Sequence, residues 1–339
     1  MTRITIKDVA REAGVSPALV SIVLNAARKE DGSLDCSISS EKSSKVMETA
    51  ERLGYKRNKA AASLRSGKSY VIGVITPDIS NNTFAQVGYH ISNLAHGDGY
   101  TVMFGSSEES AERMDEIVDA FLDSNVGGLI VTPCAGCRDA LAKAMERGVP
   151  VVLINRDIPS LGGVGRVFVD NEKSMRMCVR HLYENGFRSI EMISENMDVS
   201  SLRGRERGYE EEMASLGLTT LIHRVGTATQ EEEIARIVKT ALERGTDALI
   251  TPRINLTIYA LKAIREAGLR IPDDIAIIGH DENILYDMYT PAVSYVSQET
   301  EKVGSNAYSL LRRMMDGGEA GRMVLDPVVK FRGSSAKRK

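Results

Sequence analysis

Cysteine and histidine spacing is the first test for catalytic or metal chemistry in this chain. Cys134 and Cys137 have the Cys-x-x-Cys spacing of a redox pair or of half a zinc site. No second cysteine pair or histidine cluster completes a metal site, because Cys36 and Cys178 lie far off in sequence and the five histidines are scattered. No Ser-His-Asp or paired-carboxylate arrangement can be argued from spacing either. We therefore expect no catalytic residue, no metal and no cofactor, and a chain that is not an enzyme.

Polar side chains gather where predicted strands end. In α/β sheets small ligands bind beyond the carboxyl ends of the strands, so these positions are candidates for a binding site. The candidates are Thr76, Asp78, Asn81, Asn82, Thr83, Phe84, Thr132, Asn155, Arg156, Asp157, Asp170, Asn171, Thr251, Arg253, His280 and Asp281.

The elements that must position these residues alternate between strand and helix. Buried strands are predicted over 71–76, 101–105, 128–132 and 151–155, and then over 167–170, 190–194, 248–251 and 275–279. Helical patterns lie between them, at 114–122, 139–147, 174–183, 231–242 and 256–267. This alternation predicts doubly wound parallel sheets, and two series imply two lobes with a cleft between them. The Gly162–Gly165 run lacks the strand and the Lys-Ser/Thr of a phosphate loop and is interpreted as a turn between lobes.

Composition sets the class and the compartment. The chain has 339 residues, 42% of them hydrophobic and 26% charged, which is typical of two or three globular domains. Residues 1–70 carry thirteen Lys/Arg against eight Asp/Glu, whereas the remainder carries thirty against thirty-eight. A basic head on an acidic body is consistent with nucleic-acid binding. No apolar signal segment or membrane-spanning stretch is found, and the four cysteines form no disulfide framework, so we expect a cytoplasmic protein with no membrane partner.

Residues 5–25 are interpreted as two short helices joined by a tight turn. Thr5 can cap the first helix with Asp8 as its reciprocal partner, and Gly14 ends it. Ser16 followed by Pro17 starts the second, because serine accepts hydrogen bonds from unpaired backbone N–H groups and proline lacks only a donor that would be unpaired there. This is the outline of a helix-turn-helix, whose second helix enters the major groove of DNA. An αα-hairpin inside a core is the alternative.

The second helix has one apolar face and one face of short side chains. Residues 19, 20, 23 and 24 are expected to pack inward, leaving outward Pro17, Ala18, Ser21, Ile22 and Asn25. Ala18 and Ile22 can touch thymine methyl groups, whereas the polar members of this face and Ser16 can hydrogen-bond phosphates or bases. A third helix is predicted after Ser39 or Ser40 with Val46 and Ala50 in the core, and an Ala-rich helix, alternatively a flexible linker, follows up to Gly67.

The motif D-V-A-x-x-A-G-V-S-x-x-x-V-S-x-V-x-N, which begins at Asp8, resembles the DNA-binding signature of the LacI/GalR family of bacterial transcription regulators. The resemblance covers nearly the whole chain. It implies a periplasmic-binding-protein-like body that binds an effector, and a hinge helix that wedges a leucine into the minor groove. The residues it assigns to DNA are Thr5, Ser16, Pro17, Ala18, Ser21, Ile22, Asn25, Asn58, Ala61 and Leu64.

The same resemblance maps effector contacts onto the body. Residues that fall where related regulators hold a sugar or nucleobase are Asn81, Phe84, Thr132, Asn155, Arg205, Arg253 and Gln298, to which we add Arg156. The chain departs from the family where relatives carry an Asn-Asp pair and this sequence has Arg253 and Ile254. Arginine in place of a carboxylate favours an anionic ligand, so a phosphorylated or acidic sugar is our hypothesis.

The expected organisation is an all-α helix-turn-helix head joined to a two-lobed α/β body. The predicted bounds are a head over 1–57, a hinge over 58–67, a body over 68–333 and a disordered basic tail over 334–339. Within the body, the first lobe takes 70–157 and 296–325, and the second takes 158–295 and 326–333. The predicted function is an effector-controlled, sequence-specific transcription regulator of the repressor type, acting as a homodimer or higher oligomer on a double-stranded DNA operator. A solute-binding protein of a transport system is the chief alternative, and an enzyme has only the α/β architecture in its favour.

Overall fold

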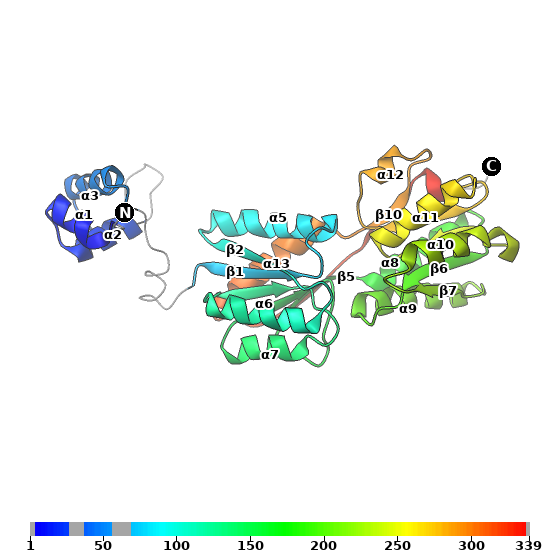
Figure 1. The fold of residues 1–339 in the computed structure, drawn as a ribbon, viewed down its shortest axis with the longest axis horizontal. Coiled ribbons are helices and arrows are strands. Elements are labelled where there is room, and N and C mark those ends of the chain that lie inside the picture. The colour runs from blue at the N-terminus through cyan, green and yellow to red at the C-terminus, as the bar shows by residue number, and fades with distance from the viewer. Residues whose placement is uncertain (1–3, 27–36, 56–68, 337–339) are drawn as a thin grey trace. The chain divides into compact units, whose positions relative to one another are not determined.

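The computed structural model describes residues 4–26, 37–55 and 69–336. The chain divides into two compact units, Met1–Lys68 and Ser69–Lys339, which we call the head and the body (Figure 1). The predicted minor-groove residues Asn58, Ala61 and Leu64 lie outside the described residues.

The described part of the head contains α1 (Ile6–Ala13), α2 (Pro17–Asn25) and α3 (Ser40–Arg52). The Asp8 carboxylate accepts hydrogen bonds from the Thr5 backbone N–H at 2.9 Å and from its hydroxyl at 2.7 Å. Gly14 ends α1 in the left-handed region with φ 69°, and the Ser16 hydroxyl accepts from the Leu19 N–H at 3.2 Å to start α2. The predicted two-helix start is therefore confirmed, together with the local signals that set it.

One small hydrophobic core holds the three helices of the head together. Its buried members are Val9, Ala10, Ala13, Val20, Val23, Val46 and Ala50. All three helices contribute, so the predicted inward positions do pack inward. The hairpin is completed by α3, and one face of α2 remains outside this core.

The first sheet of the body has the strand order β11-β5-β4-β3-β1-β2, with every pair parallel. Its strands are β1 (Val71–Thr76), β2 (Thr101–Ser106), β3 (Gly128–Val131), β4 (Val151–Ile154), β5 (Gly165–Val169) and β11 (Arg322–Leu325). Side chains alternate between two cores, so that Leu129 and Val131 face one and Ile130 the other. One core lies under α6 (Ala111–Asp123) and α7 (Arg138–Glu146), and the opposite core under α5 (Asn82–Gly97) and α13 (Thr300–Met315).

The second sheet has the order β12-β10-β9-β8-β6-β7 and is parallel except that β12 runs antiparallel to β10. Its strands are β6 (Ile190–Glu195), β7 (Ile222–Val225), β8 (Ala248–Ile250), β9 (Ala276–His280), β10 (Ser294–Ser297) and β12 (Val328–Lys330). One face packs against α8 (Asn171–Glu184) and α9 (Ser200–Ser215), the other against α10 (Gln230–Lys239) and α11 (Ile254–Glu266). Short helical turns follow at Leu242–Arg244, α12 (Leu285–Met288) and Gly333–Ser335. The predicted fold class, a helical head with a two-sheet α/β body, is confirmed.

The structure corrects the predicted lobe boundaries. We placed residues 165–169 in the second lobe, but β5 pairs with β4 and β11 in the first sheet. The segment between β4 and β5 contains no helix, so the alternation used to divide the chain gave no sign of this pairing. Because β4 and β5 both belong to the first sheet, Gly162 and Gly163 between them lie in a turn within one lobe and not in a turn between lobes. The predicted cut at 295/296 is also wrong, because β10 lies wholly in the second sheet.

The predicted disordered tail over 334–339 is wrong for its first residues. Ser334 and Ser335 are fully buried. The Ser334 hydroxyl donates to the Ile277 carbonyl at 2.6 Å and accepts from the Ser294 N–H at 2.8 Å. These contacts attach the end of the chain to β9 and β10. Small polar residues at a chain end give no sign in the sequence that they will be buried, because the strands that they contact are distant in the chain.

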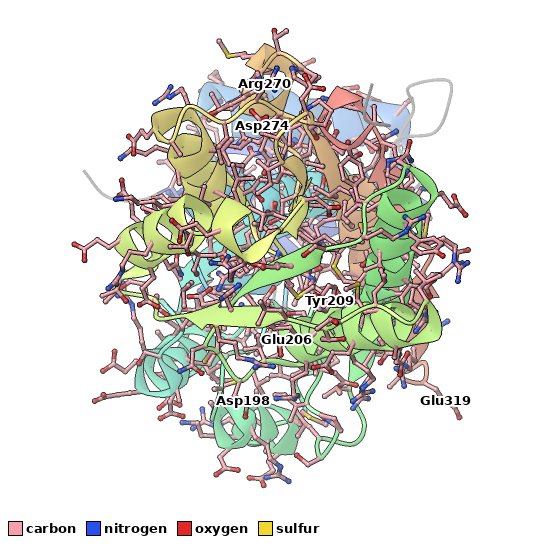
Figure 2. The ribbon with its side chains drawn as sticks, turned by 90° about the vertical axis from the view of Figure 1, so that its right-hand side faces the viewer. Asp198, Glu206, Tyr209, Arg270, Asp274 and Glu319 are labelled. Carbon is pink, nitrogen blue, oxygen red and sulfur yellow. The ribbon has the colours of Figure 1, made fainter. Side chains whose placement is uncertain are left out.

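Helix α9 is held against α8 by a glycine. A Cβ at Gly208 would lie 2.2 Å from the Glu172 carbonyl oxygen, closer than side-chain atoms can approach backbone. Tyr209, the next residue, is fully buried and donates its hydroxyl to the Ile190 carbonyl of β6 at 2.8 Å (Figure 2). Gly208 and Tyr209 therefore fix the distance of α9 from α8 and from the second sheet.

We expect Gly208→Ala to lower the free energy of unfolding of the body by about 3 kcal/mol or more, because backbone cannot move aside as a side chain can. Gly204→Ala on the same helix is the matched control. Its Cβ would lie 3.3 Å from the Asn171 side chain, and alanine favours the helix by about 1 kcal/mol. Urea unfolding of the full chain measures both. Equal stability of the two variants would contradict the assigned close packing.

Candidate functional site

A small cavity in the body lies where strands of both sheets end. Its volume is about 40 Å³. It is lined by Asn81, Thr83, Phe84, Asn155, Arg156, Val199, Ser201, Leu202, Arg205, Arg253, Asp281 and Gln298. Segments that follow β1, β4, β8, β9 and β10 meet here with α9. This is the position at which open α/β sheets bind ligands.

Arg156 enters the cavity from the end of β4. The preceding residue, Asn155, has a left-handed backbone with φ 61°. The Arg156 guanidinium donates two hydrogen bonds of 2.7 Å to the Glu109 carboxylate and one of 3.0 Å to the Pro133 carbonyl. Only 6% of Arg156 is exposed, so its charge is fixed in place by these contacts rather than by solvent.

Glu109 reaches Arg156 from a strained turn after β2. Glu108 and Glu109 both have left-handed backbones, with φ 49° and 58°, which is unfavourable for residues with a side chain. The Ser110 N–H donates to the Ser107 carbonyl at 2.9 Å and closes the turn. Strain of this kind persists where surrounding contacts compensate for it, and the paired Arg156 supplies one.

Arg205 comes from α9 and is 7% exposed. It donates to the Asn171 side-chain oxygen at 2.8 Å and to the Pro252 carbonyl at 2.6 Å. The pKa of Arg205 is lowered to about 10, chiefly by burial; the charge of Asp281 raises it, and the positive charges of Arg253 and Arg156 add to the lowering. The three arginines are therefore close enough to repel one another.

Arg253 stands immediately before α11 and pairs with the buried Glu195 carboxylate at the end of β6. Met197, which follows β6, contacts arginines of both lobes: its Sδ lies 3.6 Å from an Arg253 nitrogen and 4.0 Å from an Arg156 nitrogen. Arg156 follows a strand of the first sheet and Arg253 one of the second, so these two cations face each other across the cleft.

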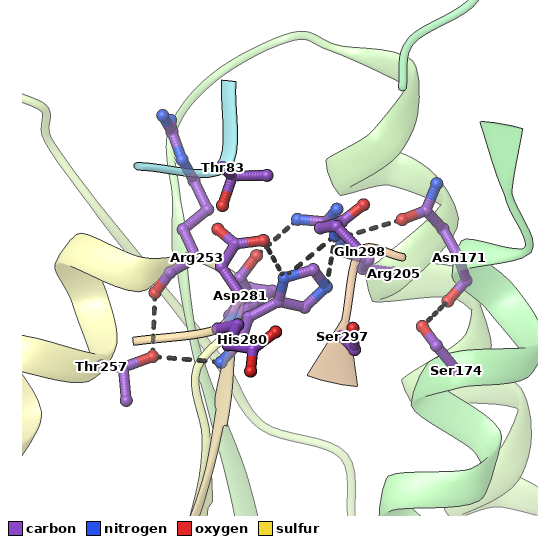
Figure 3. A network of polar contacts seen from close by, with 12 residues as sticks. Thr83, Asn171, Ser174, Arg205, Arg253, Thr257, His280, Asp281, Ser297 and Gln298 are labelled. Atoms are coloured by element: carbon purple, nitrogen blue, oxygen red, sulfur yellow. Dashed lines mark hydrogen bonds and ion pairs between the residues drawn. The ribbon is translucent and has the colours of Figure 1, made fainter. Parts of the chain in front are cut away.

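A neutral histidine supports the acidic member of the site. His280 Nδ1 donates to the Asp281 carboxylate at 2.9 Å, and Gln298 Nε2 donates to His280 Nε2 at 3.3 Å (Figure 3). Burial lowers the pKa of His280 to about 4, helped by the charge of Arg205. Burial opposes ionisation of Asp281, but His280 and the arginines hold the pKa of this carboxyl below its ordinary value. Asp281 therefore carries a negative charge among three positive ones.

The cavity brings together seven of the eight predicted effector residues, all but Thr132. Thr132 is fully buried, and its hydroxyl, like the Asn155 side-chain oxygen, has no hydrogen-bond partner within the described part of the chain. The predicted set of effector residues did not include five residues that line the cavity: Thr83, Val199, Ser201, Leu202 and Asp281. Two of them, Thr83 and Asp281, were among the broader set of strand-end candidates. The others belong to α9 or precede it, and this charged helix with two glycines was not predicted.

The predicted DNA-reading face of α2 is outside the core. Pro17, Ala18 and Ser16 are exposed, as is Thr5 before α1. Ile22 is 48% exposed, a high value for isoleucine in a folded head. Ser21 is partly buried. The structure does not describe the Asn25 side chain.

Within the described residues, no group of three or more His, Cys, Asp or Glu side chains could hold a metal ion. None of the helices described is long and apolar enough to span a bilayer. A head whose described part holds three helices, the second with one exposed face, and a body with a charged cavity where the strands of two sheets end define a DNA-binding regulator with a ligand-binding body.

Comparison with known proteins agrees with this class. Residues 5–58 match the family of bacterial regulatory proteins, lacI family, and residues 179–335 match the periplasmic-binding-protein-like domain. Catabolite control protein A of Priestia megaterium is 29% identical over 92% of this chain and 93% of its own length. The lac repressor dimer bound to operator and the anti-inducer ONPF has the same fold, with a TM-score of 0.84 at 23% identity over 99% of this chain and 100% of that one.

A third relative is a LacI transcriptional regulator from Alkaliphilus metalliredigens, solved with D-xylulofuranose. It has a TM-score of 0.71 at 22% identity, over 78% of this chain and 99% of its own. The chain described here carries a DNA-binding domain of the LacI family of bacterial regulatory proteins and a periplasmic-binding-protein-like domain, and its relatives are LacI-family regulators. It is a transcription regulator with a DNA-binding domain and an effector-binding domain.

Proposed function

We propose that this regulator is a cytoplasmic repressor that binds a pseudo-palindromic operator as a homodimer, and that a phosphorylated or acidic sugar controls it. The observation that carries the choice of ligand is the convergence of Arg156, Arg205 and Arg253 on one cavity. Arginine binds carboxylate and phosphate groups through paired N–H donors.

The side chains that line the cavity itself present more positive than negative charge to a ligand. Three arginines line it against one carboxylate, Asp281, in a body whose sequence is otherwise acidic. Glu109 and Glu195 neutralise two of the arginines but do not line the cavity. An anion placed there would oppose both the burial and the neighbouring positive charges that lower the pKa of Arg205.

The remaining lining suits the hydroxylated part of a sugar. Asp281 and the unpartnered Asn155 oxygen can accept hydrogen bonds from hydroxyl groups, and Phe84 offers an apolar ring. A volume of about 40 Å³ holds one or two water molecules, so a sugar would enter only when the lining moves. Three segments of the body connect the two sheets, from β5 to α8, from β10 to α13 and from β11 to β12. We infer that ligand binding changes how these lobes close and thereby changes the affinity for DNA.

Calorimetry with glucose, gluconate and glucose 6-phosphate tests the ligand class. We expect at least one of the two acids to bind about hundredfold more tightly than glucose, because hydrogen bonds to a charged group contribute about 1.5–3 kcal/mol each. Binding of the acid should weaken as salt rises, because salt screens the charge. Tight binding of neutral glucose alone would rule out an anionic effector.

A gel shift separates the regulator from a solute-binding protein of transport. Genomic fragments from upstream of the regulator's own gene should be retarded by the full chain, and addition of the bound acid should change the retardation. Failure to retard any of these fragments, with or without metabolite extract, would favour a transport role.

Exposed apolar side chains on the body could form a homodimer interface. Ile284 and Met288, at α12, are 73% and 74% exposed, and Tyr89 on α5 is 59% exposed. Two-fold symmetry also fits two half-sites on DNA.

We expect Ile284→Lys with Met288→Lys to shift the sedimentation of the full chain from dimer toward monomer, since paired lysines would repel across a two-fold axis. The matched control is Leu242→Lys, at another exposed apolar position of the second lobe. A wild-type chain that sediments as a monomer would contradict the proposal.

A further inference from the structure

Cys134 and Cys137 belong to no function described so far. They follow β3, in the segment that leads into α7, and are 5% and 1% exposed. Both pack in the same hydrophobic core of the first lobe. A side-chain hydrogen bond links the two thiols.

The backbone between the two cysteines permits a disulfide. Residues 135–137 form a turn, and Gly136 adopts φ 77°, which a residue with a side chain would resist. Residues three apart across a turn of this kind have Cα atoms within about 7 Å. A disulfide needs a Cα separation of about 4.4–6.8 Å, so little movement is required to form one.

The two sulfurs differ in reactivity. The Cys137 thiol donates its hydrogen bond to the Cys134 sulfur and lowers the pKa of Cys134, while burial and Glu109 oppose this and Arg156 assists it. The same hydrogen bond and burial raise the pKa of Cys137 far above its ordinary value. A thiolate is the nucleophile in thiol chemistry, and Cys134 is also the more exposed of the two residues, 5% against 1%, so we assign Cys134 as the attacking sulfur and Cys137 as the resolving one.

The pair is also connected to the charged cavity. Pro133, next to Cys134, accepts a hydrogen bond of 3.0 Å from Arg156, which lines the cavity. Movement of the 134–137 turn would shift this carbonyl and release one of the contacts that hold the guanidinium.

We propose that Cys134 and Cys137 are a redox-active pair that a peroxide converts to an intramolecular disulfide, and that the disulfide weakens the binding of an anionic effector through Arg156. The Cys134 thiolate attacks one peroxide oxygen, the O–O bond breaks and hydroxide leaves, giving a sulfenic acid. The Cys137 sulfur then attacks the Cys134 sulfur and displaces its hydroxyl, which leaves as water with the Cys137 proton. Overall, two thiols lose two electrons and two protons, and hydrogen peroxide becomes two waters. Formation of the disulfide does not depend on the proposed function, whereas its effect on the binding of an anionic effector rests on that function.

Mass spectrometry tests the chemical step. No Lys or Arg lies between Met114 and Arg138, so trypsin releases both cysteines in one peptide. After the reduced full chain is treated with hydrogen peroxide, we expect this peptide to lose two hydrogens and to resist alkylation until dithiothreitol is added. Cys178, fully buried in the second lobe, is the internal control and should keep its thiol. Peptides that remain fully reduced, or that carry sulfinic acid on Cys134 beside a free Cys137 thiol, would overturn the proposal.

Single variants assign the roles. In Cys137→Ser the Cys134 sulfenic acid should accumulate and be trapped by dimedone, whereas Cys134→Ser should leave Cys137 unreacted. Equal dimedone labelling of both variants would contradict the assignment of Cys134 as the attacking sulfur.

Calorimetry on the oxidised and re-reduced chain tests the coupling, with gluconate and glucose 6-phosphate as probes. We expect about tenfold weaker binding after oxidation, restored by dithiothreitol and absent in Cys137→Ser. A disulfide that leaves the affinity unchanged would overturn the coupling. If the disulfide forms and neither acid binds in either state, the proposed ligand class fails while the redox pair stands. If an acid binds but no disulfide forms, the present proposal fails alone.

Discussion

Arg205→Ala is expected to weaken binding of the acidic effector by about hundredfold or more. Arg205 is 7% exposed and held by the Asn171 side chain and the Pro252 carbonyl, so its guanidinium is already oriented when a ligand arrives. Loss of two hydrogen bonds to a charged ligand group is worth about 3 kcal/mol, which corresponds to this factor. The substitution also removes one of the two arginines whose charge favours ionised Asp281, which makes a second negative charge beside this buried carboxylate less favourable.

The measurement is calorimetry with the tighter-binding of gluconate and glucose 6-phosphate, combined with a gel shift. The variant should still retard DNA, but the acid should no longer change the retardation. Arg207→Ala on the same helix is the matched control, because its side chain is 62% exposed and pairs with Glu172. Thermal unfolding of both variants shows whether the body remains folded. Unchanged affinity in a folded Arg205→Ala chain would contradict a ligand-binding role for this residue.

Ile22→Asp is expected to weaken operator binding by about hundredfold or more without unfolding the head. Ile22 is 48% exposed on α2 and lies outside the buried core of the head. An aspartate there would lose apolar contact with base edges and would place a negative charge against the phosphate backbone. Ile22→Ala, which removes only the contact, should cost about tenfold.

Ser44→Asp is the control for charge alone. It adds the same negative charge at an exposed position of α3, a different helix from the one that carries residues 17, 18 and 22. We expect it to lower affinity only a few-fold, with a similar dependence on salt. Gel shifts on the retarded upstream fragment measure all three variants, and calorimetry should find effector binding unchanged. If Ser44→Asp and Ile22→Asp weakened binding equally, α2 would not be the helix that contacts DNA.

Local signals carried the sequence predictions that succeeded. The reciprocal bond between Thr5 and Asp8, the left-handed Gly14 and the Ser16-Pro17 start each act within one turn of backbone, so the helix-turn-helix could be predicted from neighbouring residues. The buried strands of parallel sheets are apolar on both faces, and short apolar runs such as 71–76 therefore marked them.

Predictions failed where a local pattern was absent or ambiguous. β5 follows β4 without a helix between them, so its place in the first sheet was decided by pairing with β4 and β11. Helix α9 carries many charges and two glycines, and its position depends on the contact of Gly208 with α8. Ser334 and Ser335 look like a polar tail, but burial against β9 and β10 orders them.

The sequence by itself determined the family, the helix-turn-helix head and the alternation that builds two parallel sheets, because each depends on residues close together in the chain. The resemblance had already placed Arg156, Arg205 and Arg253 in one effector site, but only the tertiary structure decided that Glu109 and Glu195 pair with two of them. It also decided that the carbonyl next to Cys134 in the chain accepts a hydrogen bond from Arg156. The three arginines come from separate elements in two sheets, and their shared field exists only when the sheets face each other. The interaction between charges depends on their distance in space, and the number of residues between two arginines in the sequence does not give that distance.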